Sequence, residues 1–300
     1  MGLQLPPRLR KATRPVVWAV VSVGLLALAS CSSDDRAQVG RLAMPEPATD
    51  RAVYIYDLWQ GAWIAALLTG VIVWGLIGYA CFAFRRRSDD EIPVQTRYNL
   101  PIEILYTVAP VVMVLVFFYY TVTVQNDVLE EVSADTGGAD HTLEIVGYQW
   151  SWTFNYVKDE ALDGQTSVYE GGTTGDRPTL YLPVDESVEV LLTSPDVIHS
   201  FWVPAFLFKM DVVPGRTNTF SFTPTVIGTF EGRCAELCGA YHSRMLFDVE
   251  VVSAEEYAEY LAGLEDKGQT GIVRGGEDAD TQIGIEEEVQ DDDATTEDAP

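Results

Sequence analysis

The chain has few cysteines and few basic residues, and each shortage excludes a class of protein. Four cysteines among 300 residues are too few for a disulfide-rich scaffold, so each cysteine needs its own explanation. The 19 basic residues are outnumbered by 45 acidic ones, which gives a formal net charge of -26. Because phosphate binding needs a basic surface, this charge argues against nucleic acid as the partner and favours a basic partner. A hydrophobic content of 47% excludes a disordered protein.

The negative charge lies almost entirely in the downstream part of the chain. Residues 1–129 carry 10 acidic and 11 basic residues, whereas the chain from Glu130 onward carries 35 acidic and 8 basic residues. The upstream part also holds three uncharged apolar runs, which differ in length and in the residues that flank them. Each run therefore predicts a different structure.

The first apolar run, 15–30, follows four basic residues, an order typical of a secretory signal peptide. It ends in the sequence LASC, which resembles the lipobox of bacterial lipoproteins and has Cys31 as its last residue. This resemblance implies that residues 1–30 are a signal peptide removed before Cys31, that the Cys31 thiol is lipidated, and that 31–53 form an extracytoplasmic linker. An uncleaved membrane anchor with an incidental Cys31 is the alternative.

The second and third runs, 59–84 and 104–124, contain 26 and 21 residues without a charge. Each is long enough to cross a bilayer as a helix. Three consecutive arginines and Arg97 lie between the runs, and the positive-inside rule places this short connection in the cytoplasm. We therefore predict a two-helix transmembrane hairpin over 54–126 and place everything after it on the outer face. Buried helices of a soluble core are the alternative, which the run lengths and the flanking arginines disfavour.

The region 127–266 has short alternating segments in place of long apolar runs. Gly, Pro and Asp clusters separate these segments, so the pattern predicts an all-β sandwich or barrel, closed by a short amphipathic helix over 254–264. The predicted strands are 142–150, 179–182, 187–193, 218–222, 228–233 and 245–252. The stretch 157–178 is longer than a hairpin needs, and we predict an inserted surface loop there. From 267 to 300 the acidic, glycine-rich composition predicts a disordered tail.

Residues with metal-binding chemistry concentrate in the sequence GRCAELCGAYHSRMLF. It places Cys234, Cys238, His242 and Met245 within twelve positions, and His199 lies 35 positions before Cys234. Soft sulfur together with imidazole selects copper over calcium, magnesium or manganese, and copper accepts a thioether that zinc seldom uses. The pattern therefore predicts a copper site.

Three other interpretations of these residues remain open. An exported protein can oxidise Cys234 and Cys238 to a disulfide, which would leave the two histidines and the methionine unexplained. A structural zinc site of two cysteines and two histidines is possible on ligand count, and it gives Met245 no role. Met245 taken alone is more simply a core residue.

Two transmembrane helices followed by a β domain with CAELCGAYHSRM resemble subunit II of haem-copper (aa3-type) cytochrome c oxidases, over residues 54–252. The resemblance implies a cupredoxin-like Greek-key barrel with a dinuclear copper-A centre. Its implied ligands are His199, Cys234, the backbone carbonyl of Glu236, Cys238, His242 and Met245. No CxxCH motif occurs, so a fused c-type haem is excluded and the electron donor is another protein.

The resemblance also implies a function and a location. The subunit would sit in the bacterial cell membrane, accept electrons from a c-type cytochrome and pass them to the haems of subunit I, where oxygen is reduced to water with proton translocation. Trp150 resembles the residue that receives electrons from the donor, although sheet packing is a simpler role for it. The Glu236 side chain resembles a ligand of Mg²⁺ at the contact with subunit I. Glu103 resembles a residue at a proton-channel mouth, or is a solvated carboxylate at a helix end.

Three competing functions are weaker. A quinol oxidase subunit II shares the architecture but lacks the copper ligands that this chain keeps. A copper-delivery lipoprotein would need fewer ligands and no paired membrane helices. A nitrous oxide reductase would need a large propeller domain, for which 300 residues are too few.

Overall fold

The computed structural model of the chain describes residues 33–88, 90–130, 132, 138–162 and 164–274. Cys31, the apolar run before it and the end of the acidic segment (275–300) lie outside these residues. The chain divides into two compact units. The first ends at Glu46 and contains the short helix α2 (Ser33–Gly40), and the second begins at Pro47 and contains all the other elements described below.

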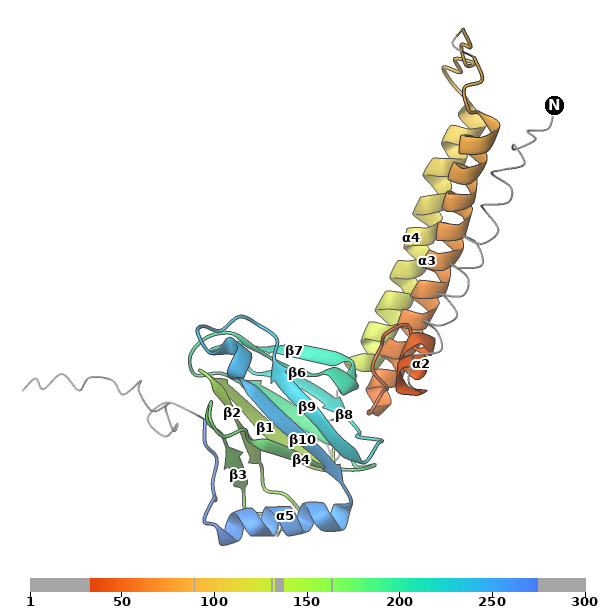
Figure 1. The fold of residues 1–300 in the computed structure, drawn as a ribbon. Coiled ribbons are helices and arrows are strands. Elements are labelled where there is room, and N and C mark those ends of the chain that lie inside the picture. Colours follow the sequence, from red (N-terminus) through yellow and green to blue (C-terminus); the bar gives the residue numbers. More distant parts are fainter. Residues whose placement is uncertain (1–32, 89, 131, 133–137, 163, 275–300) are drawn as a thin grey trace, which may run out of the picture. The chain divides into compact units, whose positions relative to one another are not determined.

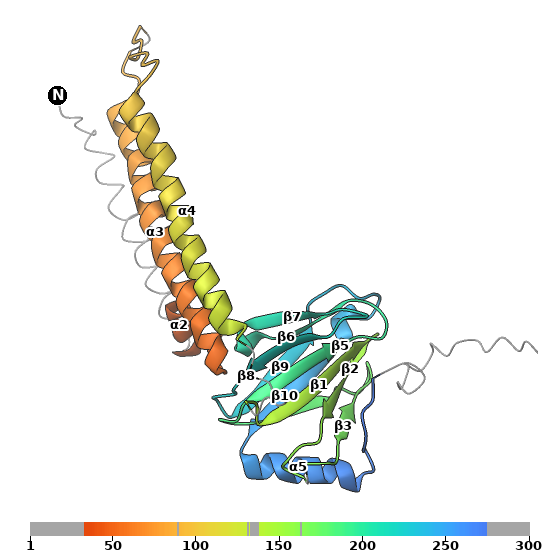
Figure 2. The same cartoon turned by 180° about the vertical axis from the view of Figure 1, so that it is seen from behind.

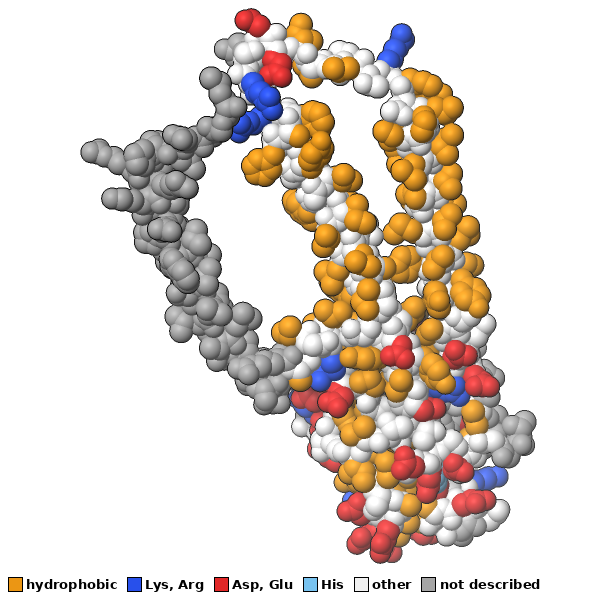
Figure 3. All heavy atoms as spheres, turned by 90° about the vertical axis from the view of Figure 1, so that its right-hand side faces the viewer, with side chains coloured by type: hydrophobic (Ala, Val, Ile, Leu, Met, Phe, Trp, Pro, Cys, Tyr) orange, Lys and Arg blue, Asp and Glu red, His pale blue; other side chains and the backbone are white. Residues whose placement is uncertain are grey.

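Two long helices, α3 (Asp50–Ala83) and α4 (Leu100–Val128), run side by side as a hairpin (Figures 1 and 2). Both are long and apolar enough to cross a membrane, and hydrophobic side chains cover their surfaces (Figure 3). Each helix begins before its uncharged run, at a polar N-cap: the side chains of Thr49 and Asn99 accept backbone hydrogen bonds from the first turns. The predicted hairpin is confirmed.

In the described part of the chain, ten strands form two five-stranded sheets packed face to face (Figures 1 and 2). One sheet has the order β3-β2-β1-β5-β8 and the other has the order β4-β10-β9-β6-β7. The chain passes repeatedly from one sheet to the other, and the predicted all-β sandwich is confirmed. The strands are β1 (His141–Tyr148), β2 (Ser151–Tyr156), β3 (Val168–Gly171), β4 (Thr179–Pro183), β5 (Val188–Thr193), β6 (His199–Val203), β7 (Phe208–Val212), β8 (Asn218–Phe222), β9 (Gly228–Cys234) and β10 (Leu246–Val252).

Four of these strands, β2, β3, β6 and β7, were not predicted. All six residues of β2 are buried, and its sequence SWTFNY alternates polar and apolar residues, a strand pattern that the prediction overlooked. The prediction of a surface loop over 157–178 is wrong for Val168–Gly171, because these residues pair with β2 as the edge strand β3. The helix predicted over 254–264 is confirmed as α5 (Ala254–Asp266), which begins with a capping box between Ser253 and Glu256.

The first residues after α5 also depart from their prediction. We predicted a disordered tail there, but its described residues, 268–274, pack on the sheet that contains β1 and β2. The backbone of Val273 exchanges two hydrogen bonds with the Asn155 side chain, at 2.7 and 2.9 Å. The Arg274 guanidinium forms two hydrogen bonds with the Glu144 carboxylate, at 2.6 and 2.9 Å. Glu144 is only 3% exposed, and a buried carboxylate needs such a partner, which composition alone does not reveal.

The core between the sheets is aromatic at the end nearest the predicted metal site. The rings of Trp152, Phe201 and Phe247 lie 5.0 to 5.9 Å apart between centroids. Gly232 of β9 faces this cluster, and a Cβ atom there would lie 2.0 Å from the Phe247 ring, so only glycine fits. Close packing of this kind makes the core beneath the metal-binding loop rigid.

A buried histidine that our sequence analysis did not single out ties four segments together at the α5 end of the domain. His141 begins β1 and is 7% exposed; its Nδ1 lies 2.9 Å from Asp159 Oδ2 and its Nε2 lies 2.6 Å from Glu186 Oε2. The Tyr257 hydroxyl of α5 donates a hydrogen bond to the same Asp159 oxygen. Burial lowers the pKa of His141, but the two carboxylates outweigh burial and raise it above its ordinary value.

This ion-pair cluster predicts a pH-dependent stability. Because the pKa of His141 is raised in the folded chain, its contribution is fully present below the ordinary histidine pKa of about 6.5 and is lost as the pH rises through the folded pKa. We expect His141→Gln to lower the free energy of unfolding by on the order of 3 kcal/mol at pH 6, and by less at pH 9. Denaturant unfolding of the purified chain followed by tryptophan fluorescence measures the difference. A difference that grows with pH would contradict the assignment.

Candidate metal centre

The predicted metal-binding residues come from two strands and one loop at the same end of the sandwich. His199 is the first residue of β6, and Cys234 is the last residue of β9, which pairs with β6. The loop that follows β9 contains Cys238 and a single 3-10 turn, η3 (His242–Arg244). Met245 closes the loop, and its carbonyl accepts a hydrogen bond from the Cys234 backbone N–H at 3.0 Å. The β ladder thus holds both ends of the loop together.

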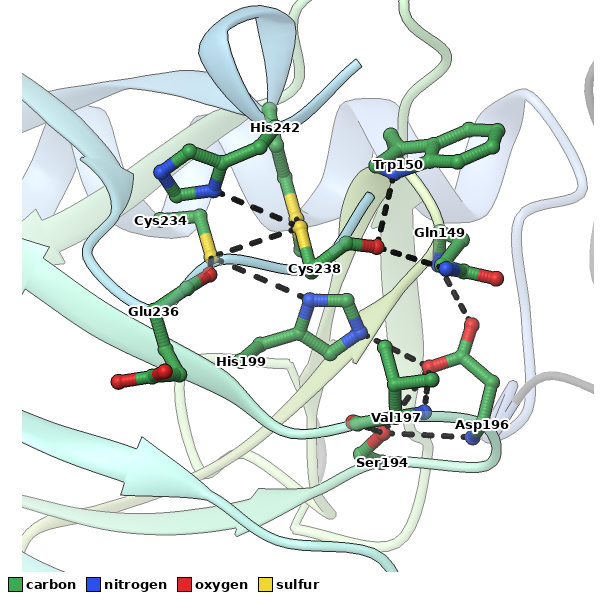
Figure 4. Close-up of polar contacts among 11 residues, drawn as sticks. Gln149, Trp150, Ser194, Asp196, Val197, His199, Cys234, Glu236, Cys238 and His242 are labelled. Atoms are coloured by element: carbon green, nitrogen blue, oxygen red, sulfur yellow. Dashed lines mark hydrogen bonds and ion pairs between the residues drawn. The ribbon is translucent and has the colours of Figure 1, made fainter. Parts of the chain in front are cut away.

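Four of these residues, His199, Cys234, Cys238 and His242, have side chains that converge on one point (Figure 4). The sulfurs of Cys234 and Cys238 are 3.9 Å apart. His199 Nδ1 lies 3.9 Å from Cys234 Sγ, and His242 Nδ1 lies 3.6 Å from Cys238 Sγ. Met245 Sδ lies 3.7 Å from Cys238 Sγ. The structure therefore brings together the five side chains that the sequence singled out.

The cluster is closed to solvent on most sides. His199 and Met245 are fully buried, and Cys234 and Cys238 are 5% and 4% exposed. Burial raises the pKa of Cys234, but hydrogen bonds from His199 and from backbone groups lower it below the ordinary thiol value. Burial and the neighbouring Cys234 sulfur raise the pKa of Cys238 to about 12. A cation between the two sulfurs would favour the ionised form of both.

Asp196 fixes the orientation of His199, a role that our sequence analysis missed. Its carboxylate lies 2.8 Å from His199 Nε2 and accepts a 2.6 Å hydrogen bond from the Gln149 backbone N–H. With Nε2 engaged in this way, Nδ1 of His199 faces the two sulfurs (Figure 4). One indication of this role was present in the sequence: Asp196 stands in a turn three residues before His199.

Trp150 lies directly against the loop that carries Cys238. Its indole Nε1–H donates a 3.1 Å hydrogen bond to the Cys238 carbonyl, and the Gln149 side-chain amide donates a 2.7 Å bond to the same oxygen. The next residue, Gly239, has a φ of +125°, and a Cβ there would lie 3.0 Å from the indole. The turn therefore requires glycine, both for its backbone conformation and to let the ring approach.

The two predicted carboxylate sites occupy different places. The Glu236 backbone carbonyl accepts a 3.1 Å hydrogen bond from Cys234 Sγ, whereas its side chain points away from the cluster (Figure 4). Glu103 lies in the first turn of α4, where its carboxylate accepts a 2.9 Å hydrogen bond from the backbone N–H of Asn99. Glu103 thus helps to cap its helix and is not part of the cluster. Cys31 lies outside the described residues.

The donor set suits copper. Cys234 and Cys238 are not joined in a disulfide, because their sulfurs are 3.9 Å apart, about twice the length of an S–S bond. Two thiols, two imidazoles and a thioether facing one point are soft donors, and a hard cation such as Mg²⁺ would not select them. Met245 also has a place at the cluster, which a four-ligand zinc site would not use.

Comparison with known proteins agrees with this chemistry. The family described as cytochrome c oxidase subunit II, periplasmic domain, matches residues 141–252. A probable cytochrome c oxidase subunit 2 of Streptomyces coelicolor is 46% identical over 92% of this chain and 94% of its own length. Cytochrome c oxidase subunit 2 of Corynebacterium glutamicum is 31% identical over 83% of this chain and 84% of its own length. The crystal structure of the periplasmic domain of subunit II of cytochrome oxidase of Bradyrhizobium japonicum is 32% identical, with a TM-score of 0.38, and covers 43% of this chain and 96% of that one.

The identity extends along nearly the full length of the Streptomyces relative, so it includes the membrane hairpin as well as the β domain. The matched family segment contains all the residues of the metal cluster, from His199 to Met245. The chain belongs to the cytochrome c oxidase subunit II family.

Proposed function

We propose that the cluster binds two copper ions as a copper-A centre, through which the subunit accepts electrons from a c-type cytochrome and passes them to the haems of subunit I. The observation that carries the proposal is the pair of buried thiols 3.9 Å apart, flanked by two imidazoles, a thioether and a backbone carbonyl. As a member of its family, the chain is a membrane protein whose β domain lies on the outer face.

Each ligand has a distinct place in this proposal. Cys234 and Cys238 would bridge the metals, and the two histidines would take one position each. Met245 and the Glu236 carbonyl would complete the set. With two copper ions bound, the two thiolates would let the metals share a transferred electron, so the centre would relay electrons with little change in its bonds and would leave no position for substrate.

The protein's own part is to keep these ligands in place. Cys234 and Met245 are held by the pairing of their strands, and His199 is held by Asp196. The loop between Cys234 and Met245 is fixed by two hydrogen bonds, which Gln149 and Trp150 donate to the Cys238 carbonyl. Ligands that are already oriented move little when the charge of the site changes, which favours fast electron transfer.

Four further residues carry proposals of their own. Trp150 would receive the electron from the donor, because its indole is hydrogen bonded to the backbone of a ligand. The exposed Glu236 carboxylate would help to hold Mg²⁺ at the contact with subunit I. Cys31 would carry the lipid anchor. Glu103 would lie at the cytoplasmic mouth of a proton path in subunit I.

The copper content of the full chain, purified in detergent and loaded with copper, tests the central proposal. We expect about two coppers per chain, a mixed-valence electron paramagnetic resonance signal shared by both metals, and reduction of that signal by a reduced c-type cytochrome. One copper or none would contradict a dinuclear centre and would favour a copper-delivery role or a quinol oxidase subunit.

A further inference from the structure

The residue at the surface beside Trp150 is Tyr241. Trp150 is only 9% exposed, whereas the Tyr241 side chain is 43% exposed. The two rings meet edge to face, with centroids 5.1 Å apart and planes at 86°. A protein that approaches this end of the domain therefore meets Tyr241 before it meets the buried indole.

Tyr241 is held in this position from two sides. It precedes η3, and its carbonyl accepts a 2.8 Å hydrogen bond from the backbone N–H of Arg244. The Arg244 guanidinium also lies over the tyrosine ring, 5.6 Å from its centroid.

The surface around Tyr241 has the character of a contact site for another protein. Leu237, in the same loop, is 77% exposed although it directly precedes the buried ligand Cys238. Tyrosine and arginine are enriched at the centres of protein interfaces, and Tyr241 and Arg244 lie in contact here. The chain from Glu130 onward carries 35 acidic and 8 basic residues, and this net negative charge favours the approach of a basic partner.

We propose that Tyr241 is the residue that the electron donor contacts, and that it carries the electronic contact from the donor's haem edge to Trp150, with Arg244 as the residue that positions the tyrosine ring. The inference builds on the proposed function, because it assumes that electrons arrive at Trp150. It adds that the indole is reached through a second aromatic ring. Tyr241 stays unoxidised throughout: the ring only bridges the gap, and the electron passes from the donor's haem to the metal centre.

The experiment uses the purified oxidase complex and reduced soluble cytochrome c in rapid-mixing kinetics. Tyr241→Ser removes the ring, and Tyr241→Phe keeps the ring without the hydroxyl. We expect the second-order rate constant for reduction of the metal centre to fall at least about tenfold in Tyr241→Ser and to stay within about twofold of the parent in Tyr241→Phe. Reduction by ascorbate, which needs no protein docking, should be unchanged in both variants, and so should the copper spectrum.

Arg244 supplies the second arm of the test. Arg244→Gln should slow donor oxidation by about threefold, and Arg244→Lys, which keeps a cation over the ring, by less. In the Tyr241→Ser background Arg244→Gln should have no further effect, because a positioning residue has nothing left to position. Additive losses would overturn the role of Arg244.

Two results would overturn the role of Tyr241: equal rates in Tyr241→Ser and Tyr241→Phe, or an equal slowing with ascorbate. Failure of the proposed function is a different outcome, since the copper spectrum of the parent complex would then be absent. If Trp150→Phe slows donor oxidation while Tyr241→Ser does not, electrons still arrive at Trp150 but do not pass through the tyrosine.

Discussion

Replacing Cys238 with serine is expected to abolish the dinuclear copper signal of the chain. The Cys238 sulfur lies within 3.9 Å of the Cys234 sulfur, the His242 imidazole and the Met245 thioether, so it stands at the centre of the cluster. A serine hydroxyl is a hard, weakly acidic donor that cannot bridge two soft metals. Electron transfer from the donor should fall more than about 100-fold. Replacing a residue that only hydrogen-bonds to a metal ligand already lowers metal affinity or activity about 10- to 100-fold, and Cys238 is itself a proposed ligand.

Copper content, the optical spectrum and electron paramagnetic resonance of the purified chain measure this loss. Cys81→Ser is the matched control, because Cys81 is an exposed residue of the membrane helix α3 and should leave all three measurements unchanged. A normal two-copper signal in Cys238→Ser would refute the ligand assignment.

Replacing Trp150 with phenylalanine is expected to slow electron delivery from the donor at least about tenfold while donor binding changes little. Phenylalanine lacks the indole N–H that donates to the Cys238 carbonyl, and its smaller ring leaves space above Gly239. The electronic contact with the ligand loop is therefore weakened. Donor binding should persist, because Trp150 is buried and the surface beside it is unchanged.

Trp202→Phe is the matched control for this prediction. Trp202 lies on β6 under the side chains of Lys209 and Arg233 and makes no contact with the Cys238 carbonyl. Rapid-mixing kinetics at several salt concentrations separate binding, which salt weakens between opposite charges, from the transfer step. An unchanged transfer rate in Trp150→Phe would show that this tryptophan only packs in the domain and does not receive electrons. The copper assignment would be unaffected.

The prediction of the membrane hairpin and of the ligand loop needed only local sequence. A run of 21 or more uncharged residues has one stable arrangement in a bilayer, because every backbone polar group must be satisfied within the helix. Cys234, Cys238, His242 and Met245 stand within twelve residues, so their chemical types and spacing indicate a soft-metal site before any fold is known.

Strand-by-strand prediction succeeded less well, for a physical reason. Strands with one face in the core alternate apolar and polar residues, and β8 was predicted with its correct bounds. The strand β3 has only four residues, too few to show that pattern, whereas β2 carries it in SWTFNY but follows β1 so closely that the two strands were not separated. Likewise the pairing of Arg274 with Glu144 joins positions 130 residues apart, and composition alone indicated disorder after α5.

The amino-acid sequence by itself determined which chemistry this protein holds and on which side of the membrane, since residue type, spacing and run length are local properties. Only the tertiary structure decided which distant residues complete the site. Asp196 meets the Gln149 backbone, and Trp150 meets the Cys238 carbonyl 88 positions away, because the two sheets bring the ends of their strands to one edge. Long-range hydrogen bonds of this kind follow from strand pairing and packing, which no short segment of the sequence specifies alone.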